Sequence, residues 1–309
     1  MMDTANRKRM RCLALILLWS LSVGTAFAGS FEGLTPGVST RGEVYQTLGS
    51  PLKKTRNARK CWFDPAPFEG KRIQAKFFDS GILRTLTLEP GQAYSLAQYE
   101  AWLGLGKPDR EEVQDGRQFH YYDSRGVALV QEGLAVDAPV AYFWHYDTGI
   151  NKLHKRWEAI RKDCTKARKQ DDCDAMERAW RSGRREFPKI AAFINHQIYW
   201  LMTCVGRPGS DRSELLALAE KAIALNPADT EFINLGWIYY SLYEDWPKAL
   251  SAFSEVNLEA NPEIHYFLGD CLEKTGGPAR EIRKHYRDCA EKDPDSKWGK
   301  KARQRLARM

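Results

Sequence analysis

The fold of the C-terminal half is decided by the stretch Phe232-Ile233-Asn234-Leu235-Gly236-Trp237-Ile238-Tyr239. It reads as the first helix of a hairpin, and a second helix follows with the spaced residues Ala249, Phe253 and Pro262. The same order returns in the next unit as His265-x₂-Leu268-Gly269-x₂-Leu272, then Ile282-x₃-Tyr286 and Pro294. A pattern that recurs at a period of about 34 residues predicts stacked pairs of helices.

The spacing has a physical reason. Gly236 and Gly269 have no side chain, so two antiparallel helices can approach closely there, and we expect Phe253 and Tyr286 to fill the space between them. A hairpin of this size cannot bury its apolar face alone and must stack on neighbours. Upstream, the segment 219–227 has the form of the second half of a repeat unit, and the tripeptide Phe193-Ile194-Asn195 is repeated as Phe232-Ile233-Asn234.

On these residues the segment 190–294 resembles the tetratricopeptide (TPR) repeat family. The resemblance implies an all-α solenoid over 150–309, with a degenerate helical pair at 150–188 and a capping helix at 295–309. It also implies a concave groove for a protein or peptide partner, lined by Ile233, Trp237, Tyr240, Tyr266, Asp270 and Glu273. The alternative is that the aromatic side chains pack against neighbouring helices. Asp270 and Glu273 disfavour a clamp for a terminal carboxylate and favour a basic or apolar segment.

The preceding half has short strand patterns and glycine and proline punctuation. Two short helices are predicted at 40–48 and 96–103, each followed by strands, at 60–64, 72–78 and 82–88 and then at 111–114, 118–122, 127–131 and 140–146. The turn around Ser80-Gly81 is echoed around Arg125-Gly126. The expected fold class is therefore an α+β module of two helix-plus-antiparallel-sheet copies over 29–148, joined to the helical half near Thr148-Gly149.

The N-terminal module resembles the outer-membrane assembly lipoprotein family (SmpA/OmlA, BamE-like), and its tandem form is similar to the β-lactamase inhibitor protein. The resemblance is carried by Gly37-Val-Ser-Thr-Arg-Gly-Glu-Val44, by Leu48-Gly49-Ser50-Pro51, and by Trp62 with the strand over 75–82. It implies a protein-binding module of the cell envelope that has no catalytic role.

The first 28 residues have the form of a secretory signal. Four basic residues precede an apolar run, and Ala26-Phe27-Ala28 supplies the small residues that a signal peptidase requires, with cleavage between Ala28 and Gly29. The alternative is an uncleaved signal anchor. Cys12 precedes the apolar run, which does not fit a lipidated cysteine. We therefore expect an exported, periplasmic protein.

The net charge of +7 is concentrated at the two ends of the chain. Residues 279–309 carry eleven basic and five acidic side chains, whereas the composition as a whole, with 43% hydrophobic and 28% charged residues, is that of a globular protein. This distribution argues against a nucleic-acid surface. It favours a solvated terminal helix face, with contact to an anionic envelope surface as the second interpretation.

Six cysteines follow the signal, and none forms a C-x-x-C pair. Cys164 and Cys173 flank a predicted turn, so a disulfide between them is a reasonable expectation. Cys271 and Cys289 fall on the two helices of one unit, where a bridge and two buried free thiols are the alternatives. Cys61 and Cys204 have no partner nearby in the sequence.

No motif in the chain indicates catalysis. The six histidines form no metal-binding pattern, and no phosphate loop, nucleophile elbow or dinucleotide fingerprint is present, so no cofactor or metal is expected. The sequence predicts a periplasmic protein–protein interaction scaffold of outer-membrane or cell-wall assembly. The alternatives are an inhibitor of a cell-wall enzyme that acts through residues 29–148, and a wall-modifying enzyme with an unrecognised site.

Overall fold

The computed structural model describes residues 30–55, 58–68, 70–92, 94–135, 138–146, 149–205 and 212–309. The predicted signal and its cleavage point, Ala28 and Gly29, lie outside these residues. The chain divides into two compact units, one ending at Arg156 and one beginning at Trp157. This division falls inside helix α4 (Ile150–Lys169), just after the boundary that the sequence suggested.

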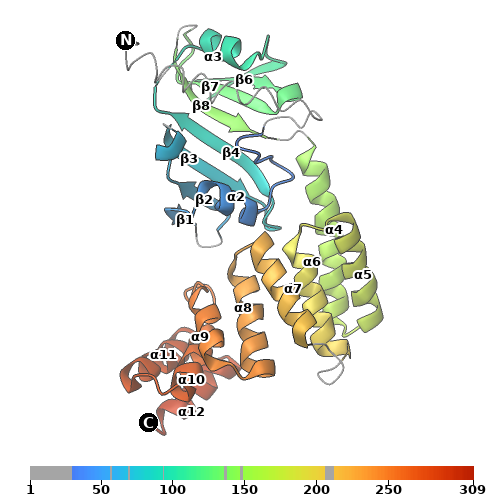
Figure 1. Ribbon diagram of the computed structural model, residues 1–309, viewed down its shortest axis with the longest axis vertical. Helices are drawn as coiled ribbons and strands as arrows, with labels where there is room; N and C mark the ends of the chain where they lie inside the picture. The colour runs from blue at the N-terminus through green and yellow to red at the C-terminus, as the bar shows by residue number, and fades with distance from the viewer. Residues whose placement is uncertain are drawn as a thin grey trace, which may run out of the picture. The chain divides into compact units, whose positions relative to one another are not determined.

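The first unit is built on one antiparallel sheet of eight strands (Figure 1). Two short helices, α2 (Arg41–Leu48) and α3 (Leu96–Leu103), precede the two groups of four strands. The strands are β1 (Lys53–Lys54), β2 (Lys60–Phe63), β3 (Gly70–Phe77), β4 (Leu83–Pro90), β5 (Arg110–Gln114), β6 (Arg117–Tyr122), β7 (Val127–Gln131) and β8 (Val140–His145), with single 3₁₀ turns at Ala66–Phe68 and Asp123–Arg125.

The sequence led us to expect two separate sheets, but the two groups form one sheet. Their last strands, β4 and β8, pair with each other, and the strand order is β1-β2-β3-β4-β8-β7-β6-β5. The joint is physically sensible because a small sheet alone has too little buried surface to be stable. Joining the groups buries one long edge of each.

Local residues account for where α2 and α3 begin and for two of the turns between strands. Thr40 and Ser95 each form a capping box, with Glu43 and Gln98 respectively, at the start of α2 and α3. In the two matching turns Gly81 has φ 80° and Gly126 has φ 58°, values that favour glycine. The two glycine turns predicted from the sequence are therefore confirmed.

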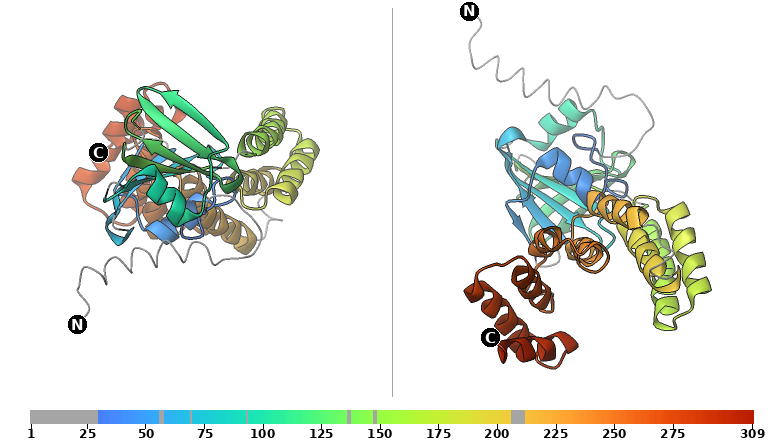
Figure 2. Two further views of the ribbon diagram at one scale, coloured as in Figure 1. Left: turned by 90° about the horizontal axis from the view of Figure 1, so that it is seen from above. Right: turned by 60° about the horizontal axis from the view of Figure 1, so that its bottom comes forward.

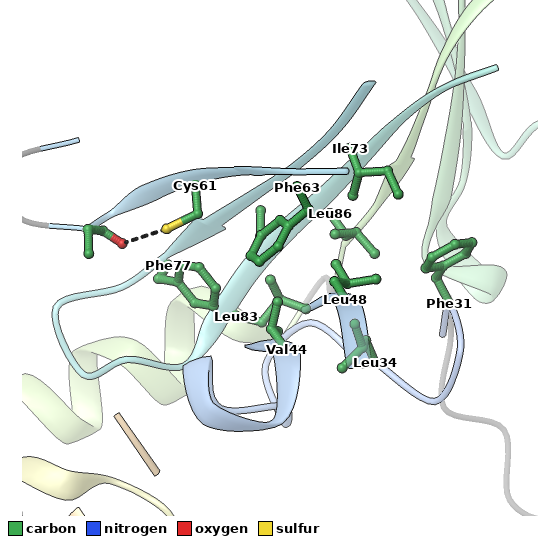
Figure 3. Packing of buried hydrophobic residues seen from close by; sticks show 12 residues of the cluster. Phe31, Leu34, Val44, Leu48, Cys61, Phe63, Ile73, Phe77, Leu83 and Leu86 are labelled. Atoms are coloured by element: carbon green, nitrogen blue, oxygen red, sulfur yellow. Dashed lines mark hydrogen bonds between the residues drawn. The ribbon is translucent and has the colours of Figure 1, made fainter. Parts of the chain in front are cut away.

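Both helices cover the same face of the sheet. Val44 and Leu48 of α2 pack on Phe63, Leu83 and Leu86, all almost completely buried (Figure 3). Tyr99 of α3 packs in the same way in a second cluster, which includes Tyr122, Leu129 and Phe143. This face is the hydrophobic core of the unit.

The second unit is helical. After α4 come α5 (Cys173–Glu186), α6 (Ala191–Trp200), α7 (Arg212–Leu225), α8 (Asp229–Ile238), α9 (Trp246–Ser254), α10 (Ile264–Lys274), α11 (Ala279–Lys292) and α12 (Lys297–Leu306). Single π-helical turns at Leu201–Val205 and Tyr239–Tyr243 extend α6 and α8. From α5 to α12, helices adjacent in the sequence pack side by side (Figure 2).

The glycines of the deciding stretch lie where the sequence predicted close approach. A β-carbon on Gly236 would lie 2.4 Å from the ring of Phe253, and one on Gly269 would lie 3.0 Å from the ring of Tyr286. Both rings are fully buried. The sequence did not point to Gly183 of α5, whose β-carbon would lie 2.3 Å from the ring of Phe193.

Candidate binding surfaces

The groove predicted in the helical half is largely filled by the chain itself. The ring of Trp237 lies 4.5 Å from that of Phe267 and 6.0 Å from that of Trp298 on α12. Tyr266 is only 7% exposed, and its ring lies 5.1 Å from that of Trp298. Ile233 and Tyr240 are half-buried against the same cluster. The alternative interpretation of these aromatic residues, packing between helices, is therefore the one that the structure shows.

The two acidic residues of the predicted groove are engaged within the chain. Asp270, 2% exposed, accepts hydrogen bonds from the Tyr240 hydroxyl at 2.7 Å and from Arg305 of α12 at 3.0 Å. Glu273 accepts from the Tyr286 hydroxyl at 2.8 Å and lies 3.4 Å from Arg305. Burial and the bond to Asp270 raise the pKa of Tyr240 well above its usual range. Asp270 is closed to a ligand, and the expectation that it lines an open groove is wrong.

The first unit presents a different surface, on the face of the sheet opposite α2 and α3. Directly paired residues of an antiparallel sheet share a face. Following the pairs from strand to strand gives one continuous row across all eight strands: Lys53, Trp62, Gln74, Thr87, Trp144, Ala128, Tyr121 and Arg110. We call the surface that contains this row the open face.

Other pairs widen the open face on both sides of the row. They add Lys60 and Lys76 on one side, and Arg72, Glu89, Tyr142, Val130, Phe119 and Glu112 on the other. Large aromatic rings therefore alternate with small residues such as Ala128 and Val130, both almost completely buried. Trp62, Tyr142 and Trp144 remain partly exposed.

Cationic side chains lie over the aromatic rings of the open face. Lys53 and Lys60 lie 5.5 and 4.9 Å from the ring of Trp62, and Lys76 lies 5.9 Å from that of Trp144. Arg72 of β3 and Arg117 of β6, strands on either side of β8 in the sheet, lie 5.5 and 5.4 Å from the ring of Tyr142. At the far edge Arg110 lies 3.5 Å from the ring of Tyr121. Each contact adds a modest cation–π attraction and holds the cation at the surface.

The arginines and lysines of the open face differ in their ionic partners. Arg72 pairs with Glu89 at 3.2 Å, Arg117 with Glu132 at 3.4 Å, and Arg110 with Asp123 at 3.2 Å. None of the ion pairs found among the described residues involves Lys53, Lys60 or Lys76. The end of the face formed by β1, β2 and β3 is therefore electropositive.

One disulfide is present among the described residues, and it is not the expected one. Cys173, the first residue of α5, is bonded to Cys204 in the π-helical turn after α6, 31 positions further along the sequence. The predicted Cys164–Cys173 bridge is wrong because Cys164 faces the helical core, together with Trp157, Ile160 and Ala167 of α4. Sequence spacing gave no sign of Cys204 as the partner.

The remaining described cysteines are buried free thiols, so a Cys271–Cys289 bridge is not formed. Burial raises the pKa of Cys164 and Cys271 to about 12 and that of Cys289 to about 11. A thiol with so high a pKa is a poor nucleophile. These side chains serve packing.

Two further findings concern chemistry and membranes. Within the described ranges no cluster of three or more histidine, cysteine, aspartate or glutamate side chains could hold a metal ion. In that same part of the chain, no helix combines the length and apolar character needed to cross a bilayer. Among the histidines, His120 is buried between Glu111, at 2.8 Å, and Gln131, at 2.7 Å.

Comparisons with known proteins place the chain in no family. No family model matches the sequence, and no curated protein is similar to it. Among solved structures, the helical fold has a partial likeness to the K341M mutant of an O-GlcNAc transferase from Thermobaculum terrenum, at 18% identity and a TM-score of 0.36. The likeness covers 44% of this chain and 26% of the transferase.

Proposed function

We propose that this protein is an exported scaffold of the cell envelope that binds a polypeptide partner through the open face of its sheet. The proposal gives the chain no catalytic role. The signal pattern of residues 1–28 supports export to the periplasm. The helical unit, which we take to be a TPR-like array, would serve as a second protein-contact surface.

The observation that carries the proposal is the composition of the open face. Tryptophan, tyrosine and arginine are the side chains that contribute most to binding at protein interfaces. Here Trp62, Tyr142 and Trp144 are partly exposed on one rigid sheet, with Arg72 and Arg117 beside them. A sheet fixes the position of these side chains before binding, so little conformational entropy is lost on association.

The experiment is capture of partners from envelope extract with two matched baits. One bait carries Tyr142→Ala and Trp144→Ala on the open face, and the control carries Tyr199→Ala and Tyr243→Ala, two exposed tyrosines of the helical unit. We expect the wild-type chain and the control to retain a defined protein that the open-face variant loses, while circular dichroism shows all three folded. Capture of the same proteins by every bait would refute the proposal.

A second candidate function is inhibition of a cell-wall enzyme. It is favoured by the fact that all residues of the open face belong to the first unit. The full-length chain would then lower the rate of a purified wall hydrolase or synthase in proportion to the fraction of enzyme that it binds. The Tyr142→Ala, Trp144→Ala variant would leave the rate unchanged. Binding without any change in enzyme rate supports the scaffold instead.

A further inference from the structure

The β1–β3 end of the open face carries a concentration of cations that the fold itself does not need. Lys60 and Lys76 are directly opposite each other in the register of β2 and β3. Like charges in this position destabilise a sheet. Lys53 of β1 is directly opposite Trp62 of β2. Two ammonium groups, of Lys53 and Lys60, therefore lie over the ring of Trp62, and that of Lys76 lies over the ring of Trp144.

Among the residues that the structure describes, these three charges have no ion-pair partner. The neighbouring arginines of the same face each have a carboxylate partner, whereas no ion pair of the described residues reaches these three lysines. Burial, followed by the charges of Lys60 and Arg84, lowers the pKa of Lys76. Lys60 and Lys76 are both partly buried, so their mutual repulsion carries a free-energy cost that a bound anion would remove.

We propose that Lys53, Lys60 and Lys76, with the rings of Trp62 and Trp144, form a subsite that docks a carboxylate-rich segment of the polypeptide partner. The inference rests on the proposed function and deepens it by naming the chemistry of the partner. It differs from the sequence-based expectation for the helical groove, which favoured a basic or apolar segment.

A polypeptide fits the subsite better than a membrane surface. The ammonium groups of the three lysines lie over the rings of Trp62 and Trp144, and both rings are only partly exposed. Lipid-anchoring aromatics must reach the interface of the bilayer. A side-chain carboxylate of an extended segment can reach the ammonium groups while its aliphatic part covers a ring.

The test uses a fluorescein-labelled oligoglutamate peptide as the probe and the full-length chain as the receptor. The variant is Lys60→Gln with Lys76→Gln, and the matched control is Lys107→Gln with Lys152→Gln, two exposed lysines of the same unit with the same change of charge. We expect the control to bind the probe as wild type does, and the variant to bind about tenfold more weakly at low ionic strength.

The variant should remain folded, because removal of two facing like charges leaves the midpoint of unfolding unchanged or raises it. Equal binding by variant and wild type would overturn the inference, as would no binding of the peptide by wild type at low salt. Binding to phosphatidylglycerol vesicles in place of the peptide would also overturn it. If a protein partner is captured through Tyr142 and Trp144 yet binds the lysine variant unchanged, the proposed function stands and this inference fails.

Discussion

The substitution Gly236→Ala tests whether the helical unit is held together by close approach of α8 and α9. An added methyl group would lie 2.4, 2.6 and 2.8 Å from three atoms of the Phe253 ring, distances that β-carbons do not adopt. The ring is 0% exposed, so it has no free space into which it can move.

Two opposing effects set the magnitude. Replacing a helical glycine with alanine stabilises a helix by about 0.5–1 kcal/mol. Overpacking a filled core costs about 1–3 kcal/mol, and this site is at the upper end because three ring atoms are too close. We therefore expect Gly236→Ala to lower the free energy of unfolding by about 1–2 kcal/mol.

Gly269→Ala is the matched comparison. Its methyl group would meet Tyr286 at 3.0 to 3.3 Å, which a shift of a few tenths of an ångström relieves. The gain in helix propensity then offsets most of the cost, and the expected change is within about 0.5 kcal/mol. A second variant, Gly236→Ala with Phe253→Leu, should recover part of the lost stability because leucine is smaller than phenylalanine.

The assay is equilibrium unfolding in urea, followed by tryptophan fluorescence and by circular dichroism. The difference between the two glycines is the decisive quantity. If Gly236→Ala is as stable as wild type, or if Gly269→Ala costs more than Gly236→Ala, the packing described for α8 and α9 is refuted.

Three other outcomes follow from the helical unit. Cys204→Ser removes the Cys173–Cys204 bridge and should lower the free energy of unfolding by about 3–4 kcal/mol, the loop entropy of a bridge between positions 31 apart in the sequence. In the unfolded wild-type protein, alkylation of Cys173 and Cys204 should require a reductant. Equal stability with and without reductant would contradict this. Burial and the neighbouring His285 lower the pKa of His265 from 6.5 to about 4, so the unfolded state binds the proton first as the pH falls. Stability should therefore decrease by up to about 3 kcal/mol between pH 6.5 and pH 4, and His265→Gln should flatten this part of the urea-midpoint curve against pH. Arg305→Ala leaves the buried carboxylate of Asp270 without its cation and should cost about 2 kcal/mol, measured by thermal unfolding; no change in melting temperature would show that the ion pair is not formed in solution.

The sequence predicted the local elements of the sheet unit well, because local signals specify them. The capping residues Thr40 and Ser95, and the turn glycines Gly81 and Gly126, act within a few residues of their own position. The pairing of β4 with β8 depends on contacts between segments more than 50 residues apart, such as Leu86 with His145. No local pattern reports such a contact, so two small sheets were expected where there is one.

The candidate sites could be predicted only in part for the same reason, because they too depend on contacts between distant segments. The alternation of Lys60 and Trp62 was visible in the sequence, but its meaning depends on which residues lie beside them in β1 and β3. In the helical unit the spacing of Trp237 and Tyr266 fitted a groove as well as a core. The structure decides between them because Trp298 of α12 lies against both.

Site-specific photo-crosslinking in cells tests the binding role of the open face most directly. A benzophenone amino acid is placed at Tyr142, at the centre of the face, and in a separate strain at Tyr199 of α6, which is exposed on the helical unit. The account predicts a discrete protein adduct from position 142 on irradiation, absent from position 199, and identified by mass spectrometry as a polypeptide with an acidic segment. Irradiation that yields no protein adduct at position 142, or the same adducts at both positions, would contradict it.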